Sequence, residues 1–195
     1  MHDKQIYLLR HGDTGLKQQY VGSSDVSLSP QGVDDIIKSC SYLSTIDFDA
    51  VLCSPMKRCV QTVAQLSCSC PVQFLDFLRE IDFGRWEKKK FVDIVQTDKT
   101  AVDLWVNNPD TFTFPEGESL ENFQQRITTA AQYLHRSKAK TILVVCHGGV
   151  IRHLLCNLLK IPKEQYLLFE IQSGSFSIIR LHEEGGVLTG LNHRG

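Results

Sequence analysis

The sequence has no long hydrophobic run and no excess of either charge. Among its 195 residues, 21 are lysine or arginine and 22 are aspartate or glutamate. No apolar stretch approaches the roughly 18 residues that a membrane span needs, and Ile6 to Leu9 is far too short for a signal peptide. The basic excess that is usual in proteins binding nucleic acid or membrane surfaces is missing. We therefore expect a cytoplasmic protein that binds neither nucleic acid nor a membrane.

Metal-binding spacings are missing as well. The seven cysteines are odd in number, scattered and without a Cys-x-x-Cys pair, which is typical of reduced thiols in the cytoplasm. His11, Asp13, His147 and His153 could be combined into a hypothetical metal site. His147 and His153, however, are six residues apart, which places them on different faces of a helix. We expect no metal ion and no other cofactor.

Strand-like and helix-like segments alternate along the chain. Short apolar runs predict strands at 6–9, 50–53, 72–75, 141–146, 166–172, 175–181 and 187–192. Apolar residues at helical spacing predict helices after Ser29-Pro30, after Ser54-Pro55 as far as Leu66, after Ser119, and from 150 to 159. Ser29, Ser54 and Ser119 are the expected N-caps of the first three, and proline follows the first two of these serines. This alternation predicts the α/β class: a three-layer α/β/α sandwich with a mostly parallel central sheet and partly antiparallel C-terminal strands.

The length suits a single domain that spans residues 1–195. Between 86 and 115 the pattern is mixed and polar, so we expect short helices that form a cap or side wall. Trp86 and Trp105 lie in this region, and packing in an aromatic core is a better explanation for them than stacking on a substrate.

Charged, histidine and glycine residues follow four of the predicted strands. They are Arg10 and His11, then Arg58 in the first turn of a helix, then Glu80, and finally His147 and Gly148. The carboxyl ends of parallel strands meet at one edge of a sheet, and ligands bind there in open α/β folds. We therefore expect these side chains to form one site.

Such a set suits phosphoryl transfer through a covalent intermediate. A neutral imidazole at His11 is a competent nucleophile if its other nitrogen is held, and the tight turn at Gly12 allows a backbone carbonyl to hold it. Guanidinium groups at Arg10 and Arg58 would bind phosphate oxygens. His147, as an imidazolium, would donate to the developing charge.

A carboxylic acid must protonate the leaving alkoxide, and Glu80 is the candidate within reach. The same carboxylate could then act as a base toward the water that hydrolyses phosphohistidine. Asp82 and Glu87 lie close by in the sequence, so a solvated carboxylate remains the alternative for Glu80. Phosphate binding by two arginines and an imidazolium would supply the charge that Mg²⁺ supplies in other phosphoryl transfers, which predicts a metal-independent phosphatase.

Six motifs, in order, resemble those of the histidine phosphatase superfamily, also called phosphoglycerate-mutase-like. They are Leu9-Arg10-His11-Gly12-Asp13-Thr14, Gly22-x-x-Asp25-x-x-Leu28-Ser29-x-x-Gly32, Ser54-Pro55-x-x-Arg58-x-x-Gln61-Thr62, Leu78-x-Glu80-x-x-x-Gly84-x-Trp86-Glu87, Gly117-Glu118-Ser119 and Val145-Cys146-His147-Gly148-Gly149. The resemblance implies a nucleophilic His11, a general acid at Glu80, and phosphate ligands at Arg10, Arg58 and His147. A small phosphorylated metabolite is then the expected substrate.

Two stretches of the sequence are similar to one group of enzymes within this family. Residues 79–87 and the ending Leu191-Asn192-x-Arg194 are most similar to the α-ribazole-5′-phosphate phosphatases of cobalamin assembly. The family commonly has asparagine six residues after the nucleophile, whereas this chain has Lys17. Lys17 and Thr14 are therefore candidate contacts to phosphate or substrate, the former as a point charge.

Other functions remain open at this point. A broad-specificity sugar-phosphate phosphatase, a phosphoglycerate mutase-like enzyme and a catalytically silent binding module would share these motifs. Cys146 to Arg152 also fits Cys-x-x-Gly-x-x-Arg, the phosphate loop of cysteine-dependent phosphatases, which would make Cys146 the nucleophile. That loop normally has serine or threonine after the arginine, and here His153 follows, so a buried and inert Cys146 is the favoured interpretation.

Overall fold

A six-stranded sheet forms the centre of the structure, a computed structural model that describes residues 3–195. Its strands are β1 (Lys4–Arg10), β2 (Ala50–Cys53), β3 (Val72–Phe74), β4 (Thr141–Cys146), β5 (Phe176–His182) and β6 (Gly185–His193). Their spatial order is β3-β2-β4-β1-β5-β6. The first four strands in that order pair in parallel, whereas β5 is antiparallel to both of its neighbours. The predicted mostly parallel sheet with a partly antiparallel C-terminal part is confirmed.

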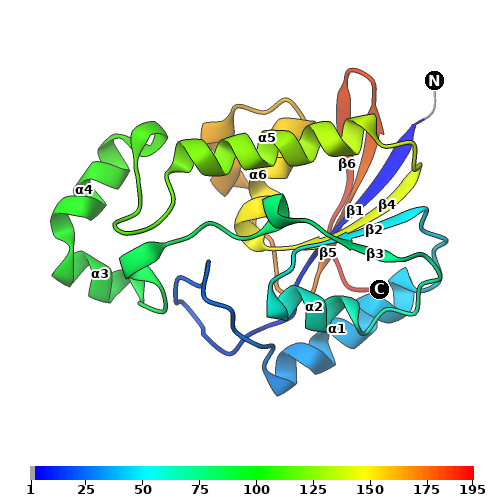
Figure 1. Cartoon of the computed structure of the whole chain (residues 1–195), viewed down its shortest axis with the longest axis horizontal. Helices are drawn as coiled ribbons and strands as arrows, with labels where there is room; N and C mark the ends of the chain where they lie inside the picture. The colour runs from blue at the N-terminus through cyan, green and yellow to red at the C-terminus, as the bar shows by residue number, and fades with distance from the viewer. Residues whose placement is uncertain (1–2) are drawn as a thin grey trace.

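Helices cover both faces of this sheet, which gives three layers (Figure 1). The covering helices are α1 (Pro30–Leu43), α2 (Lys57–Val63), α5 (Leu120–Arg136) and α6 (Gly148–Leu158). Alternate residues of β1 face opposite sides, because successive side chains of a strand point to opposite faces. Ile6 and Leu8 pack in the core beneath α5 and α6, and Tyr7 and Leu9 pack in the core beside α1 and α2. The predicted α/β/α sandwich is therefore confirmed.

Two predicted helix caps are confirmed and one is wrong. The hydroxyls of Ser29 and Ser119 accept hydrogen bonds from the backbone N–H groups of Gly32 and Asn122, at 3.0 and 3.1 Å. Ser54 does not cap α2, which begins only at Lys57 and ends at Val63 rather than Leu66. The Ser54 hydroxyl is instead bonded to His147, which directly follows β4, so a tertiary contact replaces the local one.

The predicted strand at 166–172 is also wrong. This segment is the end of a 3₁₀ helix, η4 (Lys163–Leu168), followed by irregular chain. Phe169 and Ile171 are buried, which explains the strand-like alternation. Their carbonyls, however, accept hydrogen bonds from the side chains of Arg152 and Arg10 instead of a neighbouring strand. Arginine side chains have thus taken the place of a strand ladder.

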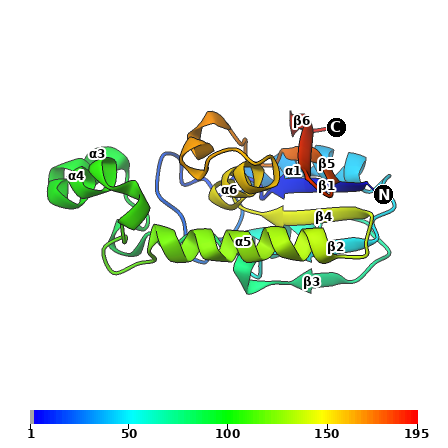
Figure 2. The same ribbon diagram turned by 90° about the horizontal axis from the view of Figure 1, so that it is seen from above.

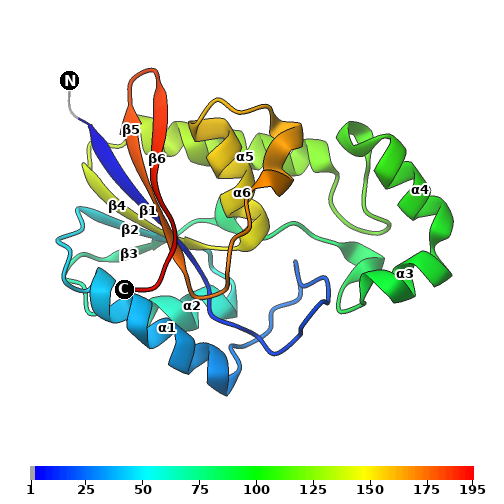
Figure 3. The ribbon, with the colours of Figure 1, turned by 180° about the vertical axis from the view of Figure 1, so that it is seen from behind.

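Residues 86–115 lie beyond the carboxyl ends of the parallel strands. They contain α3 (Phe91–Thr97), α4 (Lys99–Asn107) and a 3₁₀ turn, η3 (Pro109–Thr111), between η2 (Gly84–Trp86) and the start of α5. Figures 2 and 3 show α3 and α4 well away from the sheet, at the end of the molecule opposite the N-terminus. Trp86 is buried in an aromatic cluster there, as predicted. No helix within residues 3–195 is long and apolar enough to cross a membrane.

Candidate active site

His11, which directly follows β1, is held by its own turn. Its Nδ1 lies 2.7 Å from the carbonyl oxygen of Gly12, so in the neutral ring Nδ1 carries the proton and donates to that carbonyl. The lone pair is then on Nε2. Burial lowers the pKa of His11 well below its usual range, and the charges of Arg10 and Arg58 lower it further against the opposing effect of the Gly12 carbonyl. The ring is therefore neutral, with Nε2 available as a nucleophile.

Arg58 lies beside His11 and is completely buried. Its Nε is 3.2 Å from His11 Nε2 and 3.1 Å from Nδ1 of His147, so one N–H is shared by two imidazoles. The terminal nitrogens donate to the carbonyls of Ser24 and Gly22, at 2.9 and 2.8 Å. The guanidinium therefore links the nucleophile on β1, the histidine after β4 and the loop at 22–24 in one hydrogen-bond network.

His147 is neutral in this arrangement rather than the predicted imidazolium. Its Nδ1 accepts from Arg58, and its Nε2 lies 2.8 Å from the Ser54 hydroxyl, which serves as the acceptor of the Nε2 proton. Burial lowers the pKa of His147 well below its usual range, and the charge of Arg58 adds to this effect. Ser54 is a site residue that sequence reasoning missed. The sequence feature that could have indicated Ser54 is its position directly after β2, at the same sheet edge as the other site residues. Its serine-proline pair also has the form of a helix start, which predicts a cap instead.

Arg10, at the end of β1, has a donor without an acceptor. Its Nη1 donates to the carbonyl of Ile171 at 2.6 Å, whereas its buried Nε has no partner within the described part of the chain. A Cβ at Gly148 would lie 3.3 Å from that Nε, so the glycine allows the guanidinium to lie close against the start of α6. An unpaired buried donor is costly and rare in proteins. An anionic ligand oxygen would satisfy it.

Glu80 reaches the same edge of the sheet from the loop after η1 (Asp76–Leu78). Its Oε2 accepts from the backbone N–H of Gly149 at 2.9 Å, and its Oε1 accepts from the N–H of Ile81 at 3.1 Å. A Cβ at Gly149 would lie only 2.5 Å from Oε1. Gly149 is therefore the second site residue that sequence reasoning missed, since only glycine leaves room for this carboxylate. The sequence feature that could have indicated Gly149 is the pair of glycines directly after His147.

A cavity of about 330 Å³ opens beside these groups. Arg10, Glu80, Gly148 and Gly149 are among the residues that line it, and Arg152 adds a further positive charge. Aromatic side chains form two walls. One wall is made of Tyr20, Phe83, Trp105 and Phe114, and the other of Phe123, His153 and Tyr166. Trp105 packs against other aromatic rings, as expected, and it also lines a ligand-sized space.

Lys17 and Thr14 are the remaining candidate contacts to phosphate or substrate. Lys17 is exposed and Thr14 is half-buried, and neither is among the residues that line the cavity. Gln19, Tyr20 and Val21, from the same loop, line it instead. Contact of Lys17 or Thr14 with phosphate stays a prediction.

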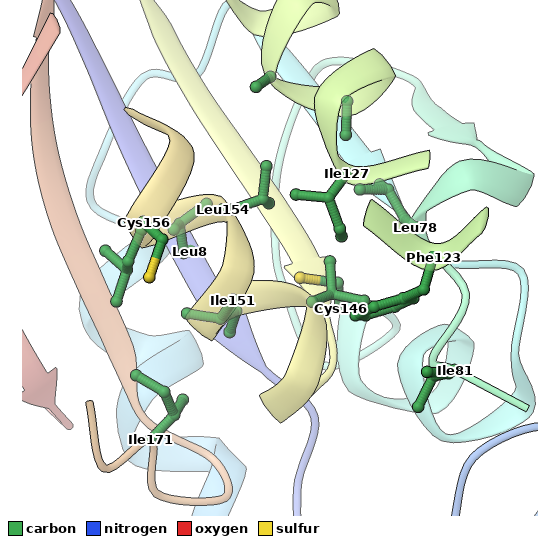
Figure 4. Close-up of a cluster of buried hydrophobic side chains, with 14 of the residues drawn as sticks. Leu8, Leu78, Ile81, Phe123, Ile127, Cys146, Ile151, Leu154, Cys156 and Ile171 are labelled. Carbon is green, nitrogen blue, oxygen red and sulfur yellow. The ribbon is translucent and has the colours of Figure 1, made fainter. Parts of the chain in front are cut away.

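The alternative nucleophile, Cys146, belongs to the hydrophobic core. Its side chain is fully buried in the hydrophobic core, among Leu78, Phe123 and Ile151 (Figure 4). Burial raises the pKa of its thiol well above the usual range, which disfavours the thiolate that a nucleophile needs. Arg152, the arginine of that hypothetical loop, donates from Nε to a backbone carbonyl at 2.8 Å. Within residues 3–195, no group of three or more His, Cys, Asp or Glu side chains is arranged to hold a metal ion.

Known phosphatases are similar to this chain along almost its whole length. The model of the histidine phosphatase superfamily (branch 1) matches residues 6–194. The adenosylcobalamin/alpha-ribazole phosphatase of Escherichia coli (strain K12) is 31% identical over 196 residues, covering 97% of this chain and 96% of that protein. Phosphoserine phosphatase 1 of Hydrogenobacter thermophilus is 25% identical over 193 residues, covering 96% and 92%. The crystal structure of the alpha-ribazole phosphatase from Shigella flexneri has a TM-score of 0.88 and 28% identity, covering 98% and 97%.

Proposed function

Since the chain belongs to the histidine phosphatase superfamily, we propose that it hydrolyses α-ribazole 5′-phosphate in cobalamin biosynthesis through a phosphohistidine at His11. The chain is a phosphatase for a small phosphorylated metabolite; the substrate and the mechanism are the proposal. The observation that carries it is the neutral His11, with its Nε2 lone pair beside Arg58, in a chain whose next residue back, Arg10, lines a cavity with aromatic walls together with Glu80. The scattered cysteines further support a cytoplasmic location.

In the first half-reaction, His11 Nε2 attacks the phosphorus atom. A phosphate oxygen takes over the shared N–H of Arg58, and another accepts from the unpaired Nε of Arg10. The P–N bond forms as the bond to the ribose oxygen breaks, and protonated Glu80 gives its proton to that oxygen. The two guanidinium groups stabilise the charge on the transferring group, so we propose that no metal ion is needed.

The second half-reaction releases phosphate. Glu80, now a carboxylate, removes a proton from water as the water oxygen attacks phosphohistidine. The P–N bond breaks, and its electron pair returns to His11 Nε2. His147 donates to Ser54 and accepts from Arg58, so its role is to hold Arg58 in place. Once phosphate has displaced that contact, His147 donates to a phosphate oxygen in its other tautomer, with the proton on Nδ1 and the Ser54 hydroxyl donating to Nε2.

The two aromatic walls support a substrate with a planar ring. α-Ribazole carries a benzimidazole ring on its ribose, and such a ring can stack against the wall that contains Trp105 and Tyr20 while the phosphate reaches Arg10. Residues 86–115 supply Trp105 and Phe114, so we propose that this segment is the side wall of the substrate site. Phosphoserine, the substrate named for one relative, has no ring to fill this space.

A panel of phosphomonoesters tests the substrate. We expect kcat/KM for α-ribazole 5′-phosphate to exceed that for phosphoserine, sugar phosphates and 3-phosphoglycerate, with phosphate released rather than an isomer formed. Trp105→Leu should lower it by about tenfold, the equivalent of roughly 1.4 kcal/mol of stacking, and leave phosphoserine turnover nearly unchanged. Leu104→Ala, on the exposed side of the same helix, is the matched control. Preference for phosphoserine, or equal losses with both substrates, would contradict the proposal.

The pH profile tests the ionisation of His11. An ordinary histidine gains a proton as pH falls through about 6.5. Burial and the charges of Arg10 and Arg58 lower the pKa of His11, so the neutral nucleophile persists below that pH. After correction for substrate ionisation, the fall in kcat/KM with decreasing pH should begin below pH 6.5, whereas a histidine of ordinary pKa would make kcat/KM fall about tenfold per unit from about that pH. Arg10→Gln removes one of the two charges and should move the acid limb to higher pH; an acid limb already at 6.5 in the unaltered enzyme would refute this ionisation.

A further inference from the structure

Arg126 and Glu118 form a half-buried ion pair away from the reacting groups. Arg126 lies on α5, and Glu118 lies two residues before that helix begins. Arg126 Nε and Nη2 donate to the two carboxylate oxygens of Glu118 at 2.8 and 2.7 Å, in the bidentate geometry. The two side chains are 25% and 16% exposed, so this pair is shielded better than a surface salt bridge.

The rest of the Arg126 guanidinium binds the backbone around Glu80. We call residues 77–82 the acid loop. Nη1 donates to the carbonyls of Phe77 and Arg79, at 3.1 and 3.0 Å, and Nη2 donates to the carbonyl of Glu80 at 3.5 Å. Together with the two bonds to Glu118, these contacts use all five N–H donors of the arginine.

Glu118 holds the other end of the acid loop. Its Oε2 accepts from the backbone N–H of Asp82 at 3.3 Å, and its own N–H donates to the Asp82 carbonyl at 2.9 Å. Beyond Leu78 the acid loop contains no helix or strand. Its backbone polar groups therefore depend on these contacts for much of their hydrogen bonding.

We propose that Arg126 and Glu118 are positioning residues for the general acid. They hold the backbone of Glu80 against α5, while the N–H of Gly149 holds its carboxylate at the start of α6. The side chain is thereby directed at the leaving-group oxygen, although neither member of the pair touches substrate. This inference rests on the proposed function, in which Glu80 is the acid. Misplacement of a catalytic group by about 1 Å can cost about 10²-fold in rate.

Lysine cannot replace Arg126 in this role. Its ammonium group is a single donor centre on a flexible stem, whereas the contacts to Glu118 and to three carbonyls need a planar group with five donors. Glu118→Gln keeps the shape of the side chain but places an amide N–H group against the arginine donors. Both substitutions should loosen the acid loop without removing Glu80 itself.

Leaving-group dependence separates this role from a merely structural one. An alkyl phosphate such as α-ribazole 5′-phosphate needs a proton on its leaving oxygen, whereas p-nitrophenyl phosphate has a leaving group that is stable as an anion. The measurement is kcat/KM, which covers only the steps up to phosphohistidine formation and so excludes the later role of Glu80 as a base. Arg126→Lys and Glu118→Gln should lower it by about tenfold or more for the alkyl phosphate and by less than about threefold for p-nitrophenyl phosphate.

Controls make each outcome decisive. Arg136→Lys, on the exposed last turn of α5, should leave both values unchanged. In a Glu80→Gln background, Arg126→Lys should lower kcat/KM for the alkyl phosphate little further, because both changes act on protonation of the leaving group. Equal losses with both substrates, or additive losses, would overturn the positioning role. If Glu80→Gln itself leaves kcat/KM for the alkyl phosphate unchanged, Glu80 is not the acid and the proposed function fails at that step. If Glu80→Gln lowers this value but Arg126→Lys and Glu118→Gln do not, only the positioning role fails.

Discussion

His11→Ala is expected to abolish turnover, lowering kcat/KM by at least about 10⁴-fold, because it removes the atom that bonds to phosphorus. The neighbouring imidazole, that of His147, offers no replacement for this atom. His147 has both ring nitrogens engaged, with Arg58 and Ser54. Rapid quenching of the unaltered enzyme with a phosphorylated substrate should trap an acid-labile, alkali-stable phosphoenzyme, and His11→Ala should trap none.

Cys146→Ser is the matched control for this experiment. The thiol lies in the core on a strand end next to the site, so its loss should affect stability more than catalysis. The expected result is turnover within a few-fold of the unaltered enzyme and an unchanged phosphoenzyme. Full turnover in His11→Ala together with loss in Cys146→Ser would instead establish the cysteine as the nucleophile. Failure of every phosphomonoester, with the fold intact, would indicate a binding module.

Arg58→Lys is the second large effect that we expect, with kcat/KM reduced by about 10²- to 10³-fold. The substitution keeps the positive charge, and it would be mild if charge alone mattered. Arg58, however, contacts two imidazoles through Nε and two carbonyls, of Gly22 and Ser24, through its terminal nitrogens. An ammonium group has one donor centre and cannot reach all four acceptors.

The loss in Arg58→Lys should fall mainly on transition-state stabilisation, so that kcat falls as well as kcat/KM. The adjacent Lys57→Gln is the control, because the Lys57 side chain is exposed at the same helix start. Thermal unfolding of both variants checks that the fold survives the change. A kcat within about threefold of the unaltered enzyme would mean that the Arg58 network is structural and that Arg10 carries phosphate binding.

Much of the candidate site could be predicted because its chemistry lies at strand ends. Periodicity located the ends of β1, β2 and β4, and the residues that follow them, His11, Arg58 and His147, meet in the structure. The acid was harder to place, because Glu80 follows a strand of only three residues and irregular chain. Its position depends on Gly149 and on Arg126, which are distant in sequence and leave no local pattern near Glu80.

The errors share one physical cause, which is a side chain whose partner lies far along the chain. Ser54-Pro55 has the local form of a helix start, but the hydroxyl bonds to His147, 93 positions away. The segment at 166–172 alternates like a strand, but its carbonyls accept from Arg152 and Arg10. Local preference is worth about 1 kcal/mol, and a buried polar group that must find a partner outweighs it.

The sequence by itself determined the α/β class, the strand ends and the residue types of a phosphatase site, since these follow from periodicity and from chemistry carried on short motifs. Only the tertiary structure decided protonation and position. Burial beside two arginines makes His11 and His147 neutral, and a shared N–H of Arg58 joins them. Burial and hydrogen-bond partners are properties of the packed chain, because residues remote in sequence exclude water and supply the acceptors.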